Sequence, residues 1–129
     1  GYICMPPKLS YTSFTLPALK FAFGSATLPD EAKVALRAFS DGLKGRSATT
    51  PAVRIEGHAD AVGESEANRV LSERRATSVR DFLVSLGVSQ SLFAVRGFGA
   101  DQPLKGVSPA APENRRVDFR RITADSRDH

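Results

Sequence analysis

The stretch "SEANRVLSERRATSVRDFLVSLG", residues 65–87, decides the fold, because it is the longest segment with a helical repeat. At about 100° per residue, its apolar side chains fall on one stripe of a helix. The stripe consists of Ala67, Val70, Leu71, Val79, Phe82, Leu83 and Leu86. Gly87 follows the last apolar residue and indicates the end of the helix. We therefore predict an amphipathic helix from about Ser65 to Leu86.

Arg75 lies inside this stripe, roughly 20° from its centre, one turn after Leu71 and one turn before Val79. A guanidinium that points inward must be paired, because an isolated buried charge is very costly. One interpretation is a structural salt bridge, or a stem that carries its charged head back out to water. The other is a cation at the floor of a cleft, where its planar fork binds a ligand carboxylate. The residues alone leave both interpretations open.

The rest of the chain alternates between strand and helix patterns. Period-2 alternation predicts strands, and a capped apolar repeat predicts one more helix. The segments are "ALKFAF" (18–23, strand), "TLPDEAKVALRAFSDGLKG" (27–45, helix), "ATTPAVRIEGH" (48–58, strand), "SLFAVRGFG" (91–99, strand) and "RRVDFRRIT" (115–123, strand). The order β-α-β-α-β-loop-β favours one sheet with helices packed on a face.

The composition fits one domain with ordinary hydrophobic and charged fractions of 41% and 25% in 129 residues. We expect a linker or N-terminal arm over 1–16, the domain over 17–124 and a frayed tail over 125–129. The single cysteine, Cys4, cannot form an intramolecular disulfide and is interpreted as an incidental thiol. No run of about 18 apolar residues occurs, so we expect no membrane-spanning helix.

The net charge of +4 suits an anionic partner without selecting one. Basic residues are interleaved with acids, as in "SERRATSVRD", residues 72–81. Nucleic-acid-binding proteins usually gather their basic residues on one face or stripe. We therefore predict that nucleic acid is not a partner.

Asp60 is the expected companion of Arg75. It follows the second predicted strand, in the loop that leads into the long helix. In open α/β sheets, ligands bind in the crevice beyond the carboxyl ends of strands. A carboxylate there and an inward arginine form a bipolar pair that suits a zwitterion, with ammonium on Asp60 and carboxylate on Arg75. Alternatively, Asp60 caps the helix or forms an internal salt bridge with Arg75.

Metal and catalytic chemistry are both disfavoured. His58 and Glu56 share a strand face, but Asp60 lies past the strand's end and the only other histidine is His129. Zinc usually needs three or four convergent ligands, so we predict neither metal nor cofactor. A glycosidase could use Glu56 with Asp60, but we expect Glu56 to be solvated or paired with Arg54. With no nucleophile motif either, we predict that the protein is not an enzyme.

Three blocks of sequence, "GHADAVG" (57–63), "NRVLSERRA" (68–76) and "ENRRV" (113–117), resemble the OmpA-like peptidoglycan-binding domain. That domain occurs in outer-membrane porin tails, the peptidoglycan-associated lipoprotein and flagellar stator proteins. The resemblance runs from about Leu19 to Ile122 and implies an α+β fold, a βαβαββ sandwich with the helices on one mixed sheet. It also implies noncovalent attachment to peptidoglycan through the diaminopimelate of the stem peptide. The implied ligand contacts are Asp60, Arg75, Asn68, Leu71, Ser72 and Arg115.

The resemblance further implies a periplasmic module of a Gram-negative bacterium that anchors an outer-membrane or envelope protein to the cell wall. Membrane contact would come only through a region before residue 1, and the oligomeric state stays open, with a dimer as one alternative. Val62 stands where many members carry a hydroxyl, and Gly24 where many carry asparagine or aspartate. These departures keep a second hypothesis open, a divergent scaffold that binds a protein partner in the envelope and whose pocket is vestigial.

Overall fold

The computed structural model describes residues 13–46 and 49–122, and side chains from Leu19 onward within these ranges. The expectations for Cys4, for the arm before residue 13 and for the tail after residue 122 lie outside the described residues. The elements are β1 (Ser13–Lys20), α1 (Asp30–Asp41), β2 (Val53–Gly57), α2 (Ser65–Ser85), β3 (Phe93–Gly97) and β4 (Arg116–Arg121). Short 3-10 turns, Gln90–Leu92 and Pro112–Asn114, precede β3 and β4.

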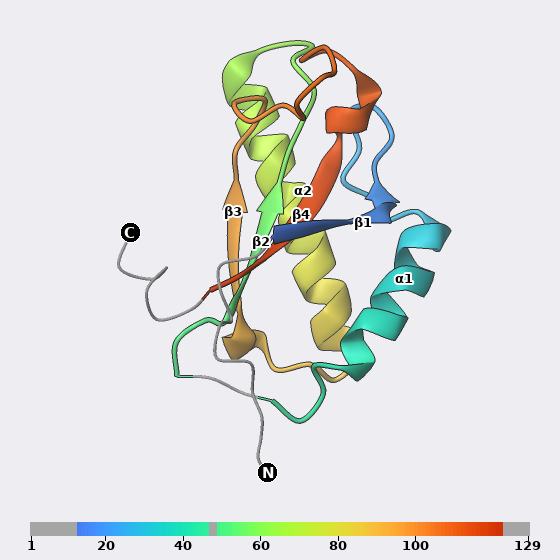
Figure 1. The fold of residues 1–129 in the computed structure, drawn as a ribbon, viewed down its shortest axis with the longest axis vertical. Coiled ribbons are helices and arrows are strands. Elements are labelled where there is room, and N and C mark those ends of the chain that lie inside the picture. The colour runs from blue at the N-terminus through green and yellow to red at the C-terminus, as the bar shows by residue number, and fades with distance from the viewer. Residues whose placement is uncertain (1–12, 47–48, 123–129) are drawn as a thin grey trace.

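The strands form one mixed sheet in the order β1-β4-β2-β3 (Figure 1). β4 pairs antiparallel with both β1 and β2, whereas β2 and β3 run parallel. The parallel pair follows from the β2-α2-β3 crossover, since parallel neighbours need a long connection. The predicted α+β class, with two helices packed on a mixed sheet, is confirmed. No described helix has the length and hydrophobicity that a membrane span requires.

The hydrophobic core lies between the helices and one face of the sheet. The sheet contributes Ile55 from β2 and Val117 and Phe119 from β4, all of them fully buried. These are the inward faces that the alternation predicted, because successive strand residues point to opposite sides. The residues between them in sequence carry charges and form the outer face of the sheet.

The first strand was predicted at the wrong position. It was expected over 18–23, but β1 covers Ser13–Lys20 and so begins within the expected arm. Leu19 and Phe21 are buried as predicted, whereas Phe23 is 66% exposed. The reason is that the chain leaves the sheet after Phe21 and turns at Gly24, whose φ of 68° is in the left-handed region that glycine adopts readily.

Helix α2 presents a different face to the sheet in its first half than the apolar stripe predicted. Val70 is 40% exposed, and the buried positions there are Asn68, Ser72 and Arg75. The cause is a notch made by two paired glycines, Gly57 on β2 and Gly97 on β3. A Cβ on Gly57 would lie 1.8 Å from the backbone oxygen of Ser72. The helix backbone therefore rests directly on the strands, and small polar side chains fill the contact.

Candidate ligand-binding site

A pocket of about 200 Å³ opens where β2 ends and α2 begins. The loop that joins these two elements lies at the upper end of the molecule in Figure 1. Four segments line it: the turn after β1, the loop after β2, the first turns of α2 and the residue before β4. The lining residues are Phe23, Gly24, Ala59, Asp60, Val62, Gly63, Glu64, Ala67, Asn68, Leu71, Arg75 and Arg115. This is the crevice beyond a strand's carboxyl end where the sequence predicted a site.

Asp60 sits in the wall of the pocket and is 4% exposed. Its Oδ1 accepts a hydrogen bond from the Val62 backbone N–H at 3.2 Å. Its Oδ2 accepts one from Arg115 Nη1, also at 3.2 Å. The expected alternatives, a helix cap or a salt bridge to Arg75, are not what the structure shows. Asp60 is an ionic partner of Arg115 whose orientation is fixed by its own loop.

Arg75 is fully buried and donates to three backbone carbonyls. Nε bonds to Ser25 O at 2.8 Å, Nη1 to His58 O at 3.1 Å and Nη2 to Ala22 O at 3.1 Å. Burial and the neighbouring Arg115 lower the pKa of Arg75 to about 10, while Asp60 acts in the opposite direction. The side chain thus stays charged at neutral pH and contributes a positive potential to the pocket that it lines.

Arg115 is the more accessible guanidinium, with a side chain 22% exposed. Its Nε donates to Phe21 O at 2.8 Å, and its Nη1 reaches Asp60. The backbone of Phe21 returns a hydrogen bond to Arg115 O. Arg115 is thereby fixed between the end of β1 and the start of β4, with one edge toward the pocket.

Five of the six predicted contact residues line the pocket, namely Asp60, Asn68, Leu71, Arg75 and Arg115. Ser72 does not. Its hydroxyl accepts from Gly99 N–H at 2.8 Å and donates to Arg69 O at 2.8 Å, beneath the helix. The structure thus gives Ser72 a scaffolding position that holds the loop after β3 against α2.

Sequence reasoning missed three residues that shape this region. Glu64 and Phe23 line the pocket and are exposed, and Asn114, which precedes Arg115, is fully buried. The Asn114 amide accepts from Leu104 N–H and donates to Ser108 O and Pro109 O, which organises the long loop before β4. A signal for Glu64 was available, because glutamate is unusual at the residue before a helix. Phe23 had been assigned to the strand face.

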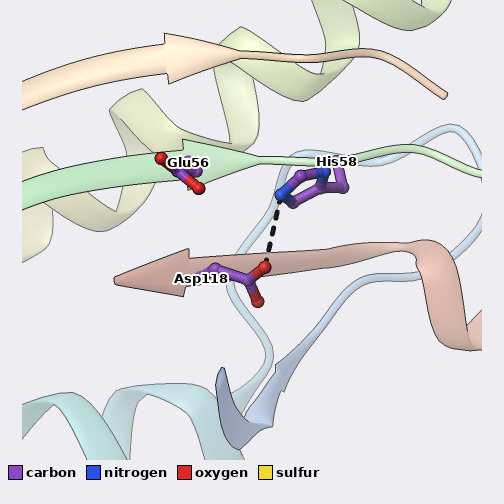
Figure 2. Close-up of side chains that lie close together, drawn as sticks. All are labelled: Glu56, His58 and Asp118. Carbon is purple, nitrogen blue, oxygen red and sulfur yellow. Dashed lines mark ion pairs between the residues drawn. The ribbon is translucent and has the colours of Figure 1, made fainter. Parts of the chain in front are cut away.

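A second polar cluster occupies the outer face of the sheet and involves the histidine of the "GHAD" motif. Figure 2 shows Glu56, His58 and Asp118 close together on β2, on the loop that follows it and on β4. The His58 ring stacks on Phe98, with centroids 5.4 Å apart, and its Nε2 lies 3.3 Å from Asp118 Oδ2. Neither ring nitrogen makes a hydrogen bond of good geometry among the described residues.

Arginines neutralise this outer cluster. Glu56, which is 1% exposed, accepts from Arg54 at 2.7 Å and from Arg120 at 3.0 Å. Arg116 donates to Asp118 at 3.2 Å. Glu56 was expected to be partly solvated or paired with Arg54, and the structure shows the pairing.

The same three side chains have the composition of a metal site. One ligand atom from each of Glu56, His58 and Asp118 lies within 4.8 Å of the other two. Three guanidinium groups already bind the two carboxylates, however, and a divalent cation would add two more positive charges beside them. The contacts therefore favour a closed ion network. The grouping also differs from the one considered from sequence, since Asp118 replaces Asp60.

Residues 20–116 match the OmpA family. Outer membrane protein A of Shigella flexneri is 35% identical over 101 residues, which is 78% of this chain and 29% of that protein. Less than a third of that relative is therefore represented here.

Solved structures of similar fold include the OmpA-like domain of FopA1 from Francisella tularensis. It is 28% identical, with a TM-score of 0.68 over 85% of this chain and 70% of that one. The peptidoglycan-associated lipoprotein from Burkholderia pseudomallei is 27% identical, with a TM-score of 0.67 over 80% of this chain and 86% of that one.

Proposed function

The chain belongs to the OmpA family, as its three motif blocks indicated, and we propose that it binds peptidoglycan noncovalently through the diaminopimelate of the stem peptide. One of its structural neighbours is named for its association with peptidoglycan. In this role the module attaches an envelope or outer-membrane protein to the cell wall in the periplasm. The chain spans 29% of the length of its relative from Shigella flexneri.

The observation that carries the proposal is the mixture of charges in a small pocket. Among the described lining residues, two are acids, Asp60 and Glu64, and two are arginines, Arg75 and Arg115. The free end of diaminopimelate carries an ammonium and a carboxylate on one carbon. A site with both signs of charge suits such a zwitterion, because each ligand charge finds an opposite partner when it leaves water.

The size of the pocket agrees with a ligand that inserts one residue end. Pockets for drug-sized molecules hold about 300–1,000 Å³, and this one holds about 200 Å³. The pocket suits the tip of a side chain, and the glycan and the rest of the peptide would then lie across its mouth. The exposed rings and methyl groups of Phe23 and Val62 border that mouth.

We propose binding without catalysis. Both carboxylate oxygens of Asp60 already accept hydrogen bonds from N–H donors. Such donors hold the carboxylate in place as a fixed negative charge for a ligand ammonium. The two guanidiniums serve the ligand carboxylate as fixed positive charges, Arg115 at the accessible edge and Arg75 from beneath.

A second candidate is a protein-binding scaffold with a vestigial pocket. It is favoured by the exposed side chains at the mouth, where Phe23 is 66% and Val62 45% exposed. Purified cell-wall sacculi separate the two hypotheses in a sedimentation assay. A wall-binding module sediments with sacculi that have been stripped of protein, and a protein-binding scaffold stays in the supernatant.

The direct test titrates a diaminopimelate-containing stem tripeptide into the wild-type protein and into Asp60→Asn. We expect roughly a 10- to 100-fold loss of affinity in the variant, because one charge-assisted contact with the ligand is removed. Asp118→Asn is the matched control, since it makes the same change in the outer cluster and should bind like the wild type. Equal affinity of all three proteins, or no binding by the wild type, contradicts the proposal.

A further inference from the structure

Four ionised side chains belong to residues that line the pocket, and one of them has no hydrogen-bond or ion-pair partner among the described residues. Asp60 is bonded through both oxygens, Arg75 through three nitrogens and Arg115 through two. Among the described residues, the Glu64 carboxylate makes no hydrogen bond and no ion pair. It is exposed at the mouth of the pocket.

The position of Glu64 in the helix does not explain why a glutamate is there. Glu64 is the N-cap of α2, with φ −76° and ψ 140°, and its side chain makes no capping hydrogen bond. Serine, threonine, aspartate and asparagine are preferred at this position because their short side chains reach the first free backbone N–H groups. The glutamate leaves that capping role unfilled, and it is one of the residues that line the pocket.

We propose that Glu64 is a second acidic contact for the side-chain ammonium of the ligand and makes the pocket selective for a free amine. This inference rests on the proposed function. The negative charge of Asp60 is matched by the positive charge of Arg115. Without Glu64, the described lining residues would therefore carry one excess positive charge, that of Arg75. With Glu64 the lining is neutral and accepts a zwitterion.

This selectivity would distinguish a ligand whose side-chain amine is free from one whose amine is acylated. An acylated side-chain amine, as in a cross-linked peptide, has lost its positive charge and keeps only the carboxylate. Glu64 attracts the ammonium of an uncross-linked peptide and repels the remaining carboxylate of an acylated one. The module is therefore expected to favour stem peptides whose diaminopimelate amine is free.

The test compares two probes, a diaminopimelate-containing stem tripeptide and the same peptide acetylated on the side-chain amine. Each is titrated into the wild type, Glu64→Gln, Glu64→Ser and a control, Glu66→Gln. Glu66 lies two residues further on, pairs with Arg69 at 2.8 Å and does not line the pocket. The preference of the wild type for the free amine should fall roughly two- to five-fold in both Glu64 variants. It should stay unchanged in Glu66→Gln.

A stability measurement separates this role from a structural one. Glu64→Ser places a capping hydroxyl at the helix start, so its melting temperature should equal or exceed that of the wild type while its selectivity falls. An unchanged preference in Glu64→Gln, or an equal loss in Glu66→Gln, overturns the inference and leaves the proposed function standing. Failure of the wild type to bind either peptide overturns both.

Discussion

In the part of the chain that the structure describes, one cluster of acids and arginines lies on each side of the end of β2. The outer cluster, Glu56, His58 and Asp118 with their arginines, lies on the outer face of the sheet, opposite the helices. The pocket cluster, Asp60, Glu64, Arg75 and Arg115, lines a cavity beside α2. Both contain the residue types of a binding site. Of these two clusters, the pocket cluster lines a cavity, and its Glu64 carboxylate has no partner among the described residues.

The register of the sheet explains the outer cluster. Glu56 on β2 stands directly opposite Asp118 on β4, and like charges in that relation are destabilising. Arg54, Arg116 and Arg120 offset the repulsion by binding the two carboxylates. The acids and arginines of the outer cluster thus bind one another, and the cluster stabilises the fold.

The pocket arises because the regular strand ends. Beyond Gly57 the chain leaves the sheet, and Asp60 is oriented by its own loop and by Arg115. No register neighbour opposes it. The comparison teaches that the charge pattern of "EGHAD" does not by itself identify a site, and that the partners of each group decide between a structural and a binding role.

The largest expected effect comes from Arg75, which touches both regions through the carbonyl of His58. Arg75→Met removes the N–H groups that donate hydrogen bonds to three backbone carbonyls, and these bonds are at least partly shielded from water. We expect a loss of about 3–5 kcal/mol in the free energy of unfolding, measured by urea denaturation. Since domains are stable by about 5–15 kcal/mol, the variant should be marginally folded.

The neighbouring Arg74 provides the control for that change, because it is exposed and has the same chemistry. Arg74→Met should lie within about 0.5 kcal/mol of the wild type, as surface substitutions usually do. A loss below about 1 kcal/mol in Arg75→Met would show that water replaces the guanidinium. Arg75 would then be a ligand contact alone and would no longer join the two clusters.

A smaller effect is expected from a substitution in the outer cluster, and it tests the contrast between the two clusters. Glu56→Gln weakens the bonds from Arg54 and Arg120 at a site that is 1% exposed, so we expect a loss of about 1–2 kcal/mol in the free energy of unfolding. Affinity for the stem tripeptide should be unchanged, because Glu56 does not line the pocket. A drop in affinity measured by calorimetry on the folded protein would contradict the division into a structural and a binding cluster.

Local patterns predicted the element order, the inward faces of β2 and β4 and the meeting of Asp60 with Arg75 in one pocket. Each of these predictions depends on the spacing of apolar residues or on the end of a strand, and both can be read directly from the sequence. The face of α2 was partly mispredicted, because the close approach at Gly57 and Gly97 is a property of two strands together.

Pairings between distant residues could not be predicted in the same way. Asp60 bonds to Arg115, 55 residues away, where the nearer Arg75 had been the expected alternative. Glu56 faces Asp118 only because β2 and β4 pair in one particular register. Both pairings depend on tertiary geometry. A one-residue shift in strand register would have turned the side chains of the strand to the opposite face of the sheet.

The smallest expected effect concerns Val62, which is 45% exposed at the pocket mouth. Val62→Thr keeps the shape of the side chain and adds a hydroxyl, and the backbone N–H that holds Asp60 is retained. A hydroxyl that bonds the ligand should contribute about 0.5–1.5 kcal/mol, or roughly a two- to ten-fold gain in affinity. Because the side chain is exposed, the free energy of unfolding should stay within about 0.5 kcal/mol. Calorimetric titration of the stem tripeptide measures the gain, and unchanged or weaker binding would show that apolar contact at the mouth is worth as much as the hydroxyl.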